Sequence, residues 1–140
     1  MVDELKTVIG NAVALAYTLA NLTTGESNTD MKTAGSIAGT VHIMPKAGSI
    51  VAIGAGSAAA ITAGTVTLKP HSNSTEFAEE GVPAPVLSSA AQQSYATVRA
   101  RALRFAAGAK LGVSLTTTTT LDPTNTLDVD AVLYVQFDND

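Results

Sequence analysis

Hydrophobic and polar residues alternate most regularly near the end of the chain, at Leu127–Phe137 (LDVDAVLYVQF). Apolar side chains occupy every second position from Leu127 to Phe137, and Asp128 and Asp130 lie between them. Successive side chains of a strand point to opposite faces of its sheet, so a period of two predicts a half-buried β-strand. This segment is the clearest strand in the sequence.

The segment Asn11–Leu22 (NAVALAYTLANL) allows two interpretations. Val13, Leu15, Tyr17 and Leu19 recur at a period of two, which favours a strand. The intervening residues are mostly alanine, the best helix former, so an Ala-rich amphipathic helix is the alternative.

Shorter strand patterns recur between these two segments, separated by Gly- and Pro-containing turns. They are Gly39–Met44, Ser49–Ile53, Thr65–Lys69, Gln92–Phe105 and Gly112–Leu121. Strands at this spacing are typical of sandwiches and barrels. About eight strands in all predict an all-β, antiparallel jelly-roll sandwich. We expect a short N-terminal arm at residues 1–10 and one domain at residues 11–140.

Two regions lack a clear strand pattern. Met1–Ile9 is predicted to be a polar arm or a first edge strand. Pro70–Ala91 is the longest irregular segment, and loops longer than about twelve residues are uncommon unless they bind something. It is therefore a candidate contact surface, with an ordinary exposed loop as the alternative. Its apolar residues are Phe77, Val82, Val86 and Leu87.

The composition points to contacts with other subunits. Charged residues make up only 14% of the chain, whereas about a quarter is usual for soluble domains. We therefore expect part of the Ala- and Thr-rich surface to lie against another copy, in a homo-oligomer. The net charge of −4 argues against a nucleic-acid partner, and there is no cysteine for a disulfide or thiolate site. The two long uncharged stretches, Thr7–Gly25 and Ala47–Leu68, lack a sustained run of large apolar residues, so no membrane association is expected.

One short motif imitates a nucleotide-binding fingerprint. Gly54-Ala55-Gly56 with Ala59 follows the apolar run Ser49–Ile53 in a G-x-G-x-x-A pattern. The fingerprint requires a helix next, but Gly64 and a β-branched run follow too soon. We interpret the motif as a loop between strands, and we predict no cofactor.

The remaining polar residues do not form a recognisable catalytic or metal-binding motif. His42 and His71 have no ligand at metal-binding spacing, and Asp122, Asp128 and Asp130 lack the spacing of a calcium loop. Structural or surface roles are expected for all of them. The sequence thus predicts a protein that is not an enzyme and has no metal site.

The turn sequences resemble those of jelly-roll virion proteins of tailed bacteriophages. The resemblance rests on Pro45-Lys46-Ala47-Gly48, Thr62-Ala63-Gly64-Thr65, the run from Phe105 to Val113, and the final strand from Val129 to Phe137. Within that family, a chain with little beyond the domain is most similar to a head decoration (cement) protein.

This resemblance implies a homotrimer on the capsid exterior of the virion, made in the host cytoplasm. It would bridge subunits of the major capsid protein, and the arm could add a strand to a capsid-protein edge. The residues expected at this contact are Met1, Val2, Asp3, Glu4, Leu5, Lys6, Phe77, Val82, Val86 and Leu87.

The alternative is a receptor- or carbohydrate-binding module of a phage tail fibre or spike. Such a module needs exposed aromatic rings. Tyr17 and Phe137 lie on predicted core faces, which leaves Tyr95, Tyr134 and Phe77 available.

Overall fold

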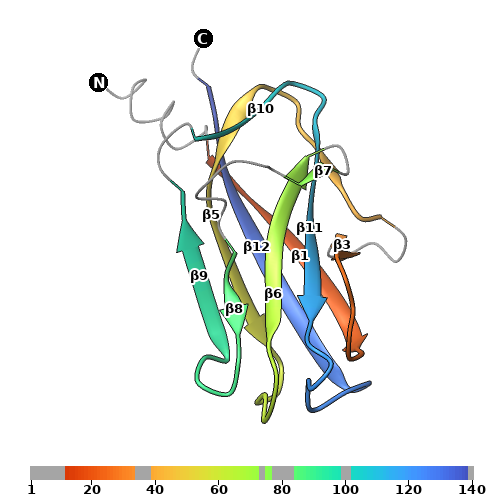
Figure 1. The fold of residues 1–140 in the computed structure, drawn as a ribbon. Coiled ribbons are helices and arrows are strands. Elements are labelled where there is room, and N and C mark those ends of the chain that lie inside the picture. Colours follow the sequence, from red (N-terminus) through yellow and green to blue (C-terminus); the bar gives the residue numbers. More distant parts are fainter. Residues whose placement is uncertain (1–11, 34–38, 73–74, 77–83, 99–101, 139–140) are drawn as a thin grey trace.

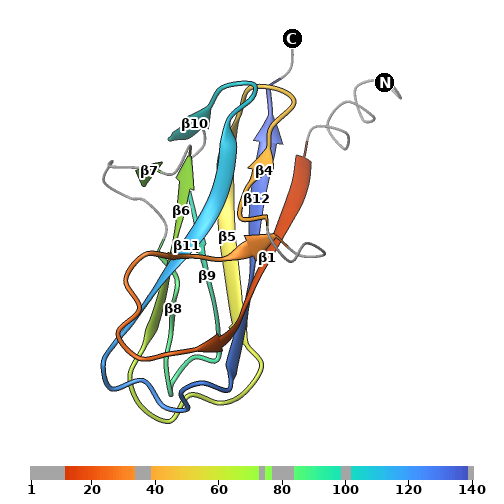
Figure 2. The ribbon, with the colours of Figure 1, turned by 90° about the vertical axis from the view of Figure 1, so that its right-hand side faces the viewer.

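The computed structural model describes residues 12–33, 39–72, 75–76, 84–98 and 102–138, which form two antiparallel sheets packed face to face (Figure 1, Figure 2). Sheet A contains β1 (Ala12–Leu22), β3 (Lys32–Thr33), β5 (Gly48–Ser57), β9 (Gln93–Thr97), β10 (Leu103–Phe105) and β12 (Leu127–Phe137). Sheet B contains β2 (Thr29–Asp30), β4 (His42–Ile43), β6 (Val66–Ser72), β7 (Thr75–Glu76), β8 (Val86–Leu87) and β11 (Lys110–Thr117). The described residues include no helix long and apolar enough to cross a membrane.

The strand order is that of a jelly roll. In sheet A, β12 lies between β1 and β5, and β9 and β10 follow along the other edge of β5. In sheet B, β11 lies between β6 and the short strands β2 and β4. The first and last strands are therefore neighbours, and Ala12 pairs with Gln136. The prediction of an all-β jelly-roll sandwich is confirmed.

The two segments with the strongest alternation form the centre of sheet A. Leu127–Phe137 is strand β12, as predicted, and the segment Asn11–Leu22 forms strand β1 from Ala12 onward. The helical alternative is wrong, because the segment pairs with β12 as a strand, and Leu15 and Tyr17 point into the core while Ala14 and Ala16 face outward.

Two predicted loops contain strand residues. Strand β5 extends to Ser57, so Gly54 and Gly56 lie inside it, hydrogen-bonded to β12 on one side and β9 on the other. The neighbouring strands on both edges hold these glycines in an extended conformation despite their low strand propensity. The predicted loop Pro70–Ala91 likewise contains the end of β6, β7 and β8.

The core lies between the sheets, and a tyrosine links them. Tyr17 on β1 is buried, and its hydroxyl donates a hydrogen bond of 2.7 Å to the carbonyl oxygen of Leu111 on β11. Burial raises the pKa of Tyr17, because the charged phenolate would lose its hydration. The ring of His42 meets the Tyr17 ring edge-on, with centroids 5.1 Å apart.

Candidate functional site

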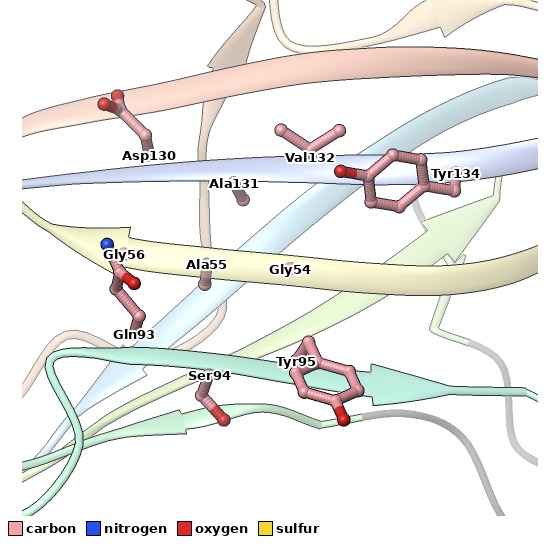
Figure 3. A pocket seen from close by; sticks show the side chains of 10 residues that line it. All are labelled: Gly54, Ala55, Gly56, Gln93, Ser94, Tyr95, Asp130, Ala131, Val132 and Tyr134. Carbon is pink, nitrogen blue, oxygen red and sulfur yellow. The ribbon is translucent and has the colours of Figure 1, made fainter.

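The outer face of sheet A carries a hollow of about 570 Å³ that crosses β9, β5 and β12 (Figure 3). Three neighbouring strands supply its lining, so its shape depends on the register of the sheet. The lining residues are Gly54, Ala55, Gly56, Gln93, Ser94, Tyr95, Asp130, Ala131, Val132 and Tyr134.

The floor of the hollow is formed by two glycines. Gly54 pairs with Tyr95 on one side and Val132 on the other, so the middle strand has no side chain between two large ones. Gly56 lies in the same way between Gln93 and Asp130. A Cβ atom added at Gly54 would meet no atom within 4 Å. The hollow therefore exists because β5 presents bare backbone there.

Two tyrosines border the hollow from opposite sides of β5. Tyr95 on β9 is 77% exposed, and Tyr134 on β12 is 44% exposed. In Figure 3 the strand carrying Gly54 runs between the two rings. An exposed tyrosine presents an apolar ring face together with a hydroxyl that can donate or accept a hydrogen bond. The two rings thus offer stacking surfaces on both sides of the floor.

The hollow has few polar side chains on the outer face of the sheet. Gln93 contributes an amide and Asp130 a carboxylate, whereas Ser94 pairs with Ala55 and its side chain points to the inner face. None of the described residues that line the hollow is Lys or Arg, so its only formal charge is that of Asp130. In the described part of the chain, no group of three His, Cys, Asp or Glu residues could hold a metal ion.

A second, shallower hollow of about 450 Å³ adjoins the first, and both include Tyr134. Its other lining residues are apolar: Ala12, Val13, Ala14, Val51, Ala52 and Val135. Tyr134 therefore separates a mixed polar and aromatic region of sheet A from an entirely aliphatic one.

The predicted contact residues fall into three groups. Met1–Lys6, Phe77 and Val82 lie outside the described residues. Val86 on β8 is exposed, in agreement with a surface role. Leu87 is fully buried, because strand alternation turns it toward the interior when Val86 points outward. Leu87 is therefore a core residue and not a contact residue.

The two histidines occupy packed positions. His42 is half-buried against Tyr17, and its Nε2 atom lies 3.3 Å from the carbonyl oxygen of Ala16. His71 is buried on the outer face of sheet B, where its Nε2 atom lies 3.1 Å from the Asp30 carboxylate.

The sequence identified Tyr95 and Tyr134 as available aromatic residues, and the structure places both at one hollow. It did not identify the glycine floor, because Gly54 and Gly56 were interpreted as a loop. One signal could have found it. The two glycines continue the alternation of the preceding apolar strand, so they share a strand face.

No protein-family model and no curated protein matches the sequence. Among solved structures, the chain is similar over 91% of its length to 86% of a chain of the cyanophage Pam1 capsid asymmetric unit, with 12% identity and a TM-score of 0.51. A chain of the acidic stable capsid of Helicobacter pylori bacteriophage KHP30 follows, with 12% identity, coverage of 89% of this chain and 87% of that one, and a TM-score of 0.48. Eiger TNF from S. frugiperda is matched at 12% identity, with coverages of 93% and 95% and a TM-score of 0.40. The likeness to the Pam1 chain is one of fold.

Proposed function

We propose that this chain is a structural protein of a phage virion that decorates the capsid by bridging neighbouring major capsid subunits. The observation that carries the proposal is the fold shared, over nearly the whole chain, with a chain of the Pam1 capsid. The turn motifs that resemble phage jelly-roll virion proteins support it independently. A decoration protein of this kind would lie on the capsid exterior.

The described edge of sheet A supports a role for the N-terminal arm. Strand β1 pairs with β3 only at Tyr17 and Thr18, so residues 12–15 have no described strand partner on that edge. An open edge presents backbone N–H and C=O groups that can pair with a strand of another chain. We propose that Met1–Lys6 extends this edge and adds a strand to a capsid protein, and that the exposed Val86 adds a second contact.

We also propose that the protein is a homotrimer. Only 14% of its residues are charged, and Val13 at the aliphatic hollow leaves apolar surface exposed to water. Burying such surface between copies is favourable by about 25 cal/mol per Å². Light scattering tests this part of the proposal, and a monomer at high concentration would contradict it.

Binding to capsids tests the function. Capsids of the phage that encodes this chain, assembled without it, are mixed with the purified protein and sedimented. We expect saturable co-sedimentation, which weakens when residues 1–9 are deleted or when Val86 is replaced by Asp. Ile43→Asp is the matched control, because Ile43 is also an exposed aliphatic residue of sheet B but lies on β4.

Two results would contradict the proposal. If the full chain does not sediment with capsids, decoration is wrong. If the folded deletion variant saturates capsids with unchanged affinity, the arm has no anchoring role. The alternative, a receptor- or carbohydrate-binding module of a fibre or spike, is favoured by one observation, the hollow between Tyr95 and Tyr134.

A further inference from the structure

We propose that the hollow between Tyr95 and Tyr134 is a binding site for an uncharged glycan. The two rings would stack against sugar rings, and Gln93 and Asp130 would form hydrogen bonds with sugar hydroxyls. This site goes beyond capsid decoration, because it would let a virion surface protein attach to neutral polysaccharide.

The shape of the site favours a ligand recognised by side chains. Strand β5 has hydrogen-bonded neighbours on both edges at Gly54, so its backbone is already paired and cannot add a peptide strand. Tyr95 is opposite Gly54 and Tyr134 is opposite Ala52, so the two tyrosines lie diagonally across β5, two strand spacings apart across the sheet and two residues apart along it. The open floor at Gly54 beside these two rings fits a ring-shaped ligand that lies along the face of the sheet.

The chemistry of the lining matches that of a sugar. One face of a pyranose ring presents C–H groups, which pack against an aromatic ring, and its edge presents hydroxyls that both donate and accept hydrogen bonds. The site supplies the complement of each, with tyrosine rings for the apolar face and an amide, a carboxylate and the tyrosine hydroxyls for the edge. Small-molecule sites generally combine aromatic walls with a few placed polar groups in this way.

The charge of the site selects an uncharged glycan. Asp130 forms no ion pair with a described residue, and no Lys or Arg is among the described lining residues. A phosphate, sialic acid or uronic acid placed in the hollow would lie near this carboxylate, with no Lys or Arg among the described lining residues to compensate, and like charges at short range repel. Neutral hexoses and N-acetylhexosamines carry no such penalty.

A purely structural role for Tyr95 does not account for its position. An aromatic side chain can pack over a glycine on the neighbouring strand and so offset the stability that the glycine costs the sheet. In that arrangement the Tyr95 ring would lie over Gly54, but no atom lies within 4 Å of the point where a Gly54 Cβ would be, and 77% of Tyr95 is exposed. The floor is left uncovered.

The test uses the full-length protein labelled with ¹⁵N and titrated with defined oligosaccharides. The probes are maltohexaose, cellohexaose, laminarihexaose and N-acetylchitohexaose, with 3′-sialyllactose as the charged comparison. We expect at least one neutral probe to give saturable amide shifts at residues 54–56, 93–95 and 130–134, and the charged probe to give none. The proposal is wrong if none of the neutral probes binds saturably.

Two variants locate the site without relying on a destabilised protein. Tyr95→Ala should weaken binding by about tenfold or more, as expected for an aromatic anchor. Gly54→Val should abolish binding while the protein stays folded, because its side chain would fill open space in a strand. Ile43→Ala removes an aliphatic side chain that is 66% exposed on sheet B, and this variant should bind like the wild type.

The remaining outcomes are also decisive. Wild-type affinity in both Tyr95→Ala and Gly54→Val would place the glycan elsewhere and overturn the proposal. Dissociation of an oligomer by Tyr95→Ala, with no saccharide binding by the wild type, would instead identify this face as a contact between copies. Capsid co-sedimentation by Tyr95→Ala should be unchanged, so a failure of this proposal is distinguishable from a failure of decoration.

Discussion

Gly54 and Gly112 occupy comparable places on the two sheets, and their surroundings are opposite. Each lies on the outward face of an interior strand, β5 in sheet A and β11 in sheet B. A Cβ at Gly112 would come within 2.5 Å of the His71 ring and 3.0 Å of the Thr40 carbonyl oxygen. At Gly54 the same atom would meet nothing within 4 Å.

The comparison separates two reasons for a glycine in a strand. In sheet B the neighbouring imidazole occupies the space of the missing side chain, so the small residue is required by close contact. In sheet A the contacts of the protein with itself impose no such requirement, although glycine weakens a strand. The open space above Gly54 is thus a feature of the surface and not a consequence of core formation.

The largest loss of stability is expected from a substitution on the core-facing side of sheet A. Leu133 on β12 is fully buried, so Leu133→Ala should lower the free energy of unfolding by about 2–5 kcal/mol. Its neighbour Val132 faces the hollow, and Val132→Ala should cost less than about 1 kcal/mol. Urea denaturation measures both. Equal losses would mean that the outer face of sheet A is packed against something and is not a free surface.

The next largest difference in stability is expected between alanine substitutions at Gly112 and at Gly54. Gly112→Ala should lower the free energy of unfolding by about 1–3 kcal/mol, because the buried His71 ring and the Thr40 backbone must both move. Gly54→Ala should leave stability unchanged or raise it by about 0.5 kcal/mol, because the new methyl group is unhindered and the unfolded chain loses freedom. Thermal unfolding of the two variants compares them directly. A destabilised Gly54→Ala would show that the hollow is smaller than described.

The smallest expected loss of stability distinguishes the core residue Tyr17 from the surface residue Tyr95 when each is replaced by phenylalanine. Tyr17→Phe removes the hydroxyl bonded to the Leu111 carbonyl and should cost about 1 kcal/mol, whereas Tyr95→Phe should be neutral. The raised pKa of Tyr17 adds a dependence on pH. Above about pH 10 the unfolded chain loses this phenol proton while the folded chain keeps it, so stability should fall with rising pH.

Urea denaturation at about pH 9 and about pH 11 checks the sign of this dependence. The loss between the two pH values should be smaller in Tyr17→Phe than in the wild type. An equal loss in both proteins would mean that Tyr17 does not contribute to the alkaline destabilisation.

Regular alternation was enough to predict the strands that bury one face. Strand β12 was predicted with its observed bounds, and β1 was predicted from Leu15 and Tyr17 despite its alanines. In these segments the large apolar side chains meet the other sheet, so local pattern and burial agree. The short strands β2, β3, β7 and β8 carry two residues each, too few for a period to be visible.

The candidate site could be predicted only in part, because its shape depends on pairing between distant strands. The exposed positions of Tyr95 and Tyr134 follow from their own strands, but their meeting across β5 requires the pairing of β9 with β5 and of β5 with β12. The strand character of Gly54 and Gly56 also comes from those neighbours, since local propensity favours a turn at glycine. Long-range register therefore decides whether this segment is a loop or a floor.

The central position of β12 in sheet A has a consequence for synthesis on the ribosome. Residues 127–137 are made after every other described strand. They nevertheless form the strand that lies between β1 and β5 and completes sheet A. Until they emerge, β1 and β5 have no shared partner, and each presents an unpaired edge. Such a topology folds slowly because most of its contacts are distant in sequence. The nascent chain is thus exposed to mispairing with other chains until β12 has emerged, and a chaperone that covers these edges would have its greatest effect before then.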